Sequence, residues 1–102
     1  MDFREISVPL ESSFALGDVP EIARSFRFQF EEAQSAWVLL YPEGMIRLSP
    51  SAGEIMKRID GKTSVEALIA DLEAAFPGGE LRRDVLEFLE VAHGRGWIEN
   101  KG

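Results

Sequence analysis

The side chains able to do chemistry are few in this sequence, and they stand apart from one another. His93 is the single histidine in 102 residues, and cysteine is absent. A lone histidine near the end of an expected helix is favoured there by the helix dipole, so it does not need a catalytic or metal-binding role. Without cysteine, the chain has no thiolate nucleophile, no disulfide and no Cys-ligated zinc or iron–sulfur cluster.

The remaining polar motifs have structural explanations. Gly94 and Gly96 follow an expected helix instead of opening one, which is typical of a helix stop and not of a nucleotide-binding loop. Four hydroxyl side chains stand where helices are expected to begin, and capping accounts for them: Ser49, Ser51, Thr63 and Ser64. We therefore expect no catalytic residue, no metal site, no cofactor and no enzymatic activity.

Net charge and composition indicate which partners and which cellular location to expect. The chain has 18 acidic and 11 basic side chains, a formal net charge of -7, which works against binding to nucleic acid. Its first residues lack the basic and apolar regions of a signal peptide. The longest apolar run, at residues 36–41, is far shorter than the roughly 20 residues of a membrane helix. We expect a cytoplasmic protein that does not bind membranes, either a monomer or a weak homodimer.

The elements that would position a site begin after an irregular start. Residues 1–24 contain Pro9, Gly17 and Pro20 with no sustained period, so we interpret them as a partly flexible N-terminal arm before a domain at 25–102. From Phe26 to Glu31 phenylalanines alternate with polar residues, which predicts a half-buried strand. Residues 37–41 are apolar on both faces and predict the central strand, and residues 45–48 predict a third.

Three helices are expected to follow these strands. The first starts at Ser49-Pro50 and ends at Asp60-Gly61, with a capping box from Ser51 to Glu54. The second has a capping box from Thr63 to Glu66 and stops before Pro77. The third spans about 81–93, after which Trp97-Ile98 returns to close the core. The fold class is therefore α+β: a three-stranded antiparallel sheet followed by three helices, of winged helix-turn-helix type.

Several segments in this order resemble the PqqD family. They are Trp37 to Met45, Leu48, Ser51 to Ile55, Asp60-Gly61, Phe76, Asp84 to Leu89 and Gly96 to Ile98. The ordered set is specific, above all the Trp37–Met45 block, and it spans about residues 26–99.

The resemblance implies a peptide chaperone in pyrroloquinoline quinone (PQQ) biosynthesis. Members of that family bind the precursor peptide PqqA and present it to the radical S-adenosylmethionine (SAM) enzyme PqqE. They are similar to the recognition elements of other ribosomally synthesised and post-translationally modified peptides (RiPPs). The cofactors belong to the enzyme, which agrees with the absence of cysteine here. The alternatives are the same fold serving another ribosomal peptide pathway, and a winged-helix DNA-binding domain. Few basic residues in the last two expected helices disfavour DNA binding.

A peptide site also follows from physical argument. In a meander, the third strand has one free edge whose unpaired N–H and C=O groups suit β-augmentation. One flank of the third expected helix leads from its apolar stripe to solvent. The predicted peptide-binding residues are Met45, Ile46, Arg47 and Leu48 on the strand, and Arg82, Leu86, Leu89 and His93 on that flank. Arg47 would meet an acidic peptide residue, or would simply guard an exposed strand edge.

The first testable prediction is that the protein contains no bound metal ion. We expect protein purified without an affinity tag to contain no stoichiometric metal, because it lacks cysteine and has one histidine. Elemental analysis by mass spectrometry is the check. Zinc or iron at one equivalent per chain would contradict this expectation.

Overall fold

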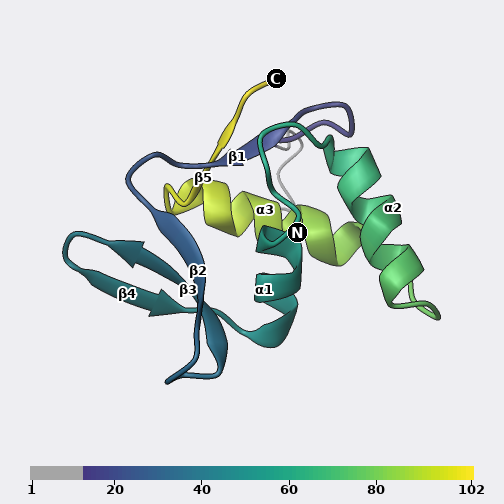
Figure 1. Cartoon of the computed structure of the whole chain (residues 1–102). Coiled ribbons are helices and arrows are strands. Elements are labelled where there is room, and N and C mark those ends of the chain that lie inside the picture. Colours follow the sequence, from purple (N-terminus) through teal and green to yellow (C-terminus); the bar gives the residue numbers. More distant parts are fainter. Residues whose placement is uncertain (1–12) are drawn as a thin grey trace, which may run out of the picture.

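Two small sheets and three helices make up the structure, a computed structural model that describes residues 13–102 (Figure 1). In chain order they are β1 (Pro20–Ile22), β2 (Arg27–Glu31), β3 (Ala36–Tyr41), β4 (Gly44–Arg47), α1 (Pro50–Met56), α2 (Val65–Ala75), α3 (Arg82–Gly94) and β5 (Ile98–Asn100). The predicted antiparallel meander is confirmed, with strand order β2-β3-β4. The predicted α+β, winged-helix-like class is confirmed as well.

The second sheet, β1 with β5, was not expected from the sequence. It joins the two ends of the described chain, with Ile22 opposite Ile98. Ahead of β1, Phe14 is only 2% exposed and belongs to the hydrophobic core. The folded domain therefore includes residues 13–24, which the sequence pattern assigns to a partly flexible arm. Residues 1–12 of that arm lie outside the described residues.

The hairpin β3–β4 follows its sequence pattern closely. Tyr41 pairs with Gly44, which leaves Pro42 and Glu43 as the turn. Proline fixes its own φ, and so favours a turn at this point. On β2 and β3, Phe28 and Trp37 lie on the same face and stack with ring centroids 4.5 Å apart. This aromatic face of the sheet packs against the core.

Helix α1 begins where the sequence indicates and ends earlier. Ser49 is its N-cap and accepts a hydrogen bond from the Ala52 N–H at 3.2 Å, with Pro50 in the first turn. The capping box expected from Ser51 is not formed, because Ser49 already occupies the N-cap position. The helix stops at Met56, and Gly61 adopts its positive φ of 76° in the loop beyond.

The loop before α2 is held by Asp60. Its carboxylate accepts hydrogen bonds from the N–H groups of Lys62 and Thr63, which hold the pKa of Asp60 below its ordinary value. Thr63 also donates its hydroxyl to Asp60, so the capping box predicted at Thr63 is wrong. Ser64 caps α2 instead, accepting from the Ala67 N–H at 3.1 Å.

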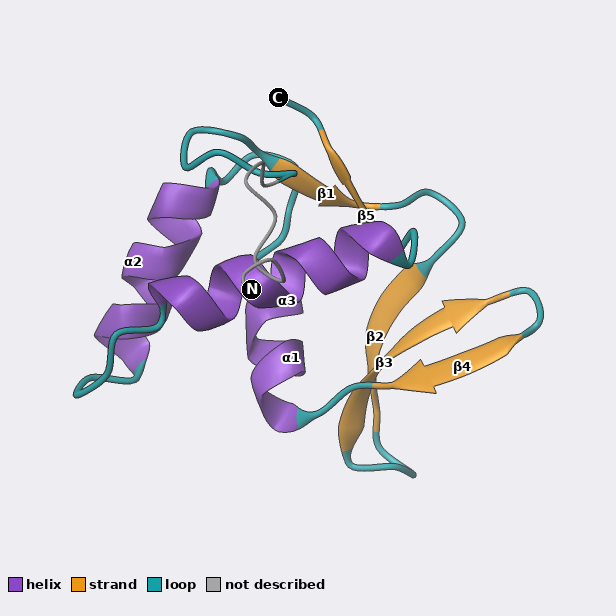
Figure 2. Cartoon of the chain, turned by 180° about the vertical axis from the view of Figure 1, so that it is seen from behind, coloured by secondary structure: helices purple, strands orange, loops and turns teal. Residues whose placement is uncertain are grey.

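The core lies where the helices meet the aromatic face of the sheet. The side chains of Leu39, Met56, Leu68 and Leu89 are 0% exposed, and Ile98 is 1% exposed, as expected for the returning C-terminal segment. Helix α3 crosses α1, and the view from the back shows α3 in front with the three-stranded sheet beside it (Figure 2). Within residues 13–102, no helix is long and apolar enough to cross a membrane.

Helix α1 is fixed to the sheet by a close approach of Gly53 to Trp37. A Cβ atom on Gly53 would lie 2.9 Å from Trp37 Cδ1 and 3.2 Å from its Cβ and Cγ atoms. Real Cβ atoms do not approach this closely, so only glycine allows the helix to sit here. The contact sets the position of α1 and of the chain that enters it from β4.

Substitution of this glycine tests that packing. We expect Gly53→Ala to lower the free energy of unfolding by about 1–3 kcal/mol through overpacking, despite the better helix propensity of alanine. Gly94→Ala is the matched control, because Gly94 is also helical and has open space around its Cβ position. Urea unfolding is the measurement, and equal stability of the two variants would contradict the contact.

Candidate functional site

The free edge of β4 is the first component of the candidate site. β4 pairs with β3 on one side only, since it ends the strand order. Leu48 N–H donates to the Trp37 carbonyl at 2.9 Å. With Val38 opposite Arg47 and Leu40 opposite Met45, hydrogen-bonded and non-bonded pairs alternate along the ladder. Met45 and Arg47 therefore direct their backbone N–H and C=O groups outward.

The side chains of β4 divide between the two faces of the sheet. Met45 is 42% exposed and Arg47 is exposed, whereas Ile46 is half-buried and Leu48 is a core residue. Of the four predicted strand residues, Met45 and Arg47 thus offer both backbone and side chain to a ligand. Arg47 has no carboxylate within ion-pair distance among residues 13–102, so its charge is available to one.

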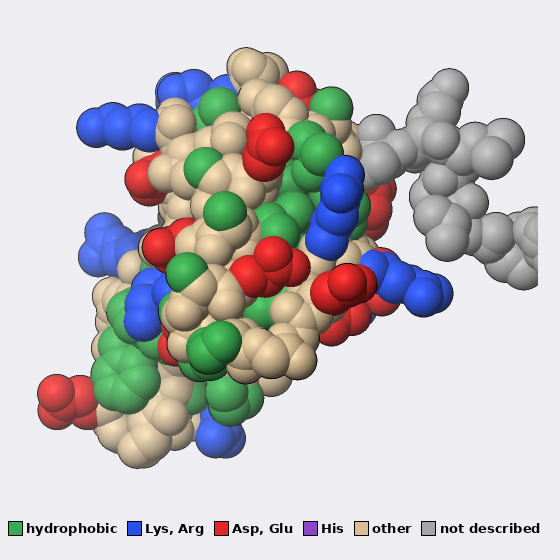
Figure 3. Space-filling view, turned by 90° about the vertical axis from the view of Figure 1, so that its right-hand side faces the viewer, with side chains coloured by type: hydrophobic (Ala, Val, Ile, Leu, Met, Phe, Trp, Pro, Cys, Tyr) green, Lys and Arg blue, Asp and Glu red, His purple; other side chains and the backbone are tan. Residues whose placement is uncertain are grey.

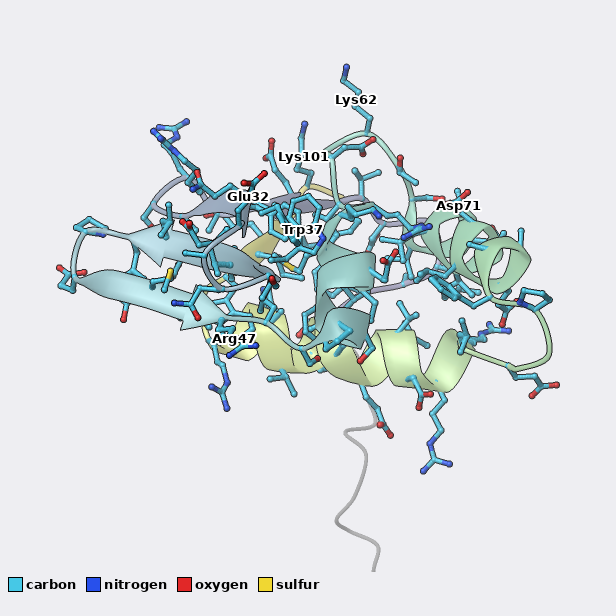
Figure 4. All side chains as sticks on the ribbon, turned by 60° about the horizontal axis from the view of Figure 1, so that its bottom comes forward. Glu32, Trp37, Arg47, Lys62, Asp71 and Lys101 are labelled. Carbon is cyan, nitrogen blue, oxygen red and sulfur yellow. The ribbon has the colours of Figure 1, made fainter. Side chains whose placement is uncertain are left out.

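Helix α3 supplies the second component. In Figure 4, Arg47 at the end of β4 lies on the side of the sheet along which α3 runs. Ser49 and Pro50, which follow β4, line an apolar groove together with Phe88 of α3. Val91 is one turn further along the helix on the same side and is 50% exposed. Phe88 and Val91 therefore form the part of α3 that faces the β4 side.

The predicted helix residues occupy other positions. Leu89 is fully buried in the core and has no surface to offer. The imidazole of His93 packs edge-to-face on Phe14, with ring centroids 5.6 Å apart. Arg82 lines a separate hollow with Leu16, and Leu86 packs against the edge of the core.

The structure therefore does not bring these four residues to the β4 edge. Glu90, between Leu86 and His93 on the helix surface, accepts a hydrogen bond from the Ser13 N–H. The segment that starts at Ser13 thus lies along this flank of α3. Contact of Arg82, Leu86 or His93 with a peptide stays a prediction, and the geometry favours Phe88 and Val91 instead. The apolar stripe of α3 has two flanks, and the sequence contains no signal that distinguishes them.

The acidic side chain nearest the start of α1 is committed to ion pairs. The Arg58 guanidinium donates to Glu54 at 2.9 Å and lowers the pKa of that carboxyl, with a smaller contribution from Lys57 at 3.4 Å. A carboxyl with a lowered pKa is a poor proton donor near neutral pH. Among residues 13–102, no group of three His, Cys, Asp or Glu side chains is arranged to hold a metal ion.

A winged-helix-like domain with a free sheet edge beside a partly apolar helix defines a class of small binding proteins. Comparison with known proteins then identifies the family. The family described as "Coenzyme PQQ synthesis protein D (PqqD)" matches residues 36–98. The chain belongs to the PqqD family.

Curated relatives agree with this assignment. A protein of Azotobacter vinelandii named "PqqA binding protein" is 51% identical over 89 residues, covering 86% of this chain and 97% of the relative. A protein of the same name from Pseudomonas paraeruginosa is 54% identical over 86 residues, covering 83% and 94%. The similarity therefore extends over nearly the whole length of both relatives.

A solved structure supports the fold. The PqqD portion of Methylobacterium extorquens PqqCD, described as a functional, stand-alone RiPP recognition element, is similar with a TM-score of 0.70 and 27% identity. The match covers 84% of this chain and 94% of that one.

Proposed function

We propose that this protein binds the precursor peptide PqqA and presents it to the radical SAM enzyme PqqE in PQQ biosynthesis, without performing chemistry itself. The names of the curated relatives support PqqA as the peptide that is bound. The solved relative, described as a recognition element, supports the role of binding without chemistry. Delivery to PqqE rests on the pathway to which the family belongs.

The observation that carries this proposal is the outward-facing backbone of Met45 and Arg47. An extended peptide that pairs with these groups adds a fourth strand to the sheet. Main-chain hydrogen bonds then give affinity, while side chains that alternate between the two faces give selectivity. An acidic peptide residue beside Arg47 would satisfy the guanidinium, which has no carboxylate partner in the described structure.

On the helix side, the peptide would pack against Phe88 and Val91. Val91 is half-exposed on the helix although it is apolar, and Phe88 lies partly buried next to Trp97, with ring centroids 6.5 Å apart. Burial of such surface in a complex is favourable by about 25 cal/mol per Å². The peptide would thus be held on one side by the β4 backbone and on the other by apolar side chains.

Amide exchange measured by NMR tests the added strand. On addition of synthetic PqqA, we expect the amides of Met45 and Arg47 to gain protection, because their N–H groups become hydrogen-bonded. Ile46 and Leu48 should change little, because their N–H groups face β3. The amides of β2, the other edge of the sheet, serve as an internal control.

Two results would overturn this binding mode. New protection confined to β2 would place the peptide on the opposite edge. Absence of any saturable response to PqqA, with a response to an unrelated leader peptide, would assign the protein to another ribosomal peptide pathway.

A pair of charge substitutions tests which flank of α3 contacts the peptide. We expect Val91→Asp to weaken PqqA binding by about 1–2 kcal/mol, because it places a charge where apolar surface should be buried. His93→Asp should bind as wild type does, since His93 lies on the flank next to Phe14. Calorimetric titration of both folded variants is the measurement. If His93→Asp weakens binding more than Val91→Asp does, the peptide contacts the flank of Arg82, Leu86 and His93 instead.

A further inference from the structure

An apolar groove of about 570 Å³ lies between the start of α1, the end of α2 and the first turns of α3. Apolar side chains from all three helices line it: Ile55, Leu72, Phe76, Leu81, Val85 and Phe88. Clefts of several hundred Å³ with such linings are typical of sites that take a ligand. The proposed peptide site reaches only Phe88 on the rim of this groove, so it does not account for the lining by Ile55, Leu72 and Phe76.

The lining of this groove includes aromatic surface that the domain leaves in water. Phe76, the C-cap residue of α2, is 48% exposed, and Phe88 is only partly buried. A single exposed phenylalanine would need no explanation, but these two share one hollow. Viewed from the end that carries α2, recessed hydrophobic side chains are visible between charged ones (Figure 3).

The groove is continuous with the β4 edge. Ser49 and Pro50 form part of its wall, and they follow β4 after one residue, Leu48. A chain that pairs with Met45 and Arg47 and continues in the direction of β4 reaches this wall within a few residues, at about 3.3 Å per residue. The chain would enter the groove without reversing direction.

The charge on the rim indicates what the occupant carries. Asp84 lines the groove and forms no ion pair or hydrogen bond through its carboxylate within residues 13–102, unlike Glu54 opposite, which is paired with Arg58. A second copy of this chain would bring a further net charge of -7 toward these carboxylates. An occupant with an apolar residue next to a Lys or Arg is complementary both to the apolar lining and to the carboxylate of Asp84.

We propose that this groove is a second subsite for the same precursor peptide. It binds one large apolar side chain located a few residues from the added strand, and Asp84 pairs with a cationic residue beside it. This inference rests on the proposed function, because it takes the peptide on β4 as the occupant.

A double-mutant cycle with synthetic PqqA tests the subsite. Phe76→Ala should weaken binding about tenfold, and Asp84→Asn about threefold with a smaller dependence on salt. Among the large apolar residues of the peptide, one should lose much less affinity on substitution by alanine when the peptide is tested against Phe76→Ala than when it is tested against wild type. That peptide residue is the one that occupies the groove. Glu87→Gln is the control for the charge change and should bind as wild type, since Glu87 pairs with Arg83 and does not line the groove.

The outcomes separate this inference from the proposed function. Wild-type affinity of Phe76→Ala, with protection of Met45 and Arg47 intact, would overturn the subsite and leave the strand on β4. Failure of wild type to bind the peptide would overturn both. If Phe76→Ala weakens only self-association in sedimentation, or only binding to the modifying enzyme, the groove belongs to that partner and the subsite is wrong.

Discussion

The approach of Gly53 to Trp37 is the contact on which the rest of this structure depends. The indole stacks on Phe28 in the sheet, and it leaves no room for a Cβ atom on α1. The backbone of α1 at Gly53 is thereby held directly against the Trp37 side chain on the sheet. The chain that leaves β4 must therefore turn into α1 at Ser49. The β4 edge and the wall of the apolar groove are consequently parts of one rigid arrangement.

The pairing of β1 with β5 constrains the opposite side of the molecule. It brings the segment after Ser13 along α3, where Phe14 enters the core and meets His93. One flank of the helix is thereby next to the domain's own N-terminal segment. The other flank, with Phe88 and the half-exposed Val91, remains for a ligand. The pairing of β1 with β5 thus determines which flank of α3 is accessible to a ligand.

The distribution of charge suits a protein that holds a partner. Among residues 13–102, the ion pairs lie on or beside the helices, such as Arg58 with Glu54 and Arg83 with Glu87, and an exposed pair such as Arg83 with Glu87 contributes little to stability. Arg47 on the β4 edge and Asp84 on the groove rim have no such partner in the described part of the chain. Opposite charges at the two ends of a proposed peptide path would fix its direction.

The sequence by itself determined the antiparallel meander, the three helices that follow it and the start of α1, because these depend on local periodicity, proline and capping residues. It also determined that β4 is an edge, since short turns leave a meander no other arrangement. It did not reveal β1–β5, whose paired residues are 76 to 80 positions apart and carry no local pattern. Nor could it choose between the flanks of α3: a helical wheel orders residues around an axis, but only tertiary packing decides which neighbour covers each side.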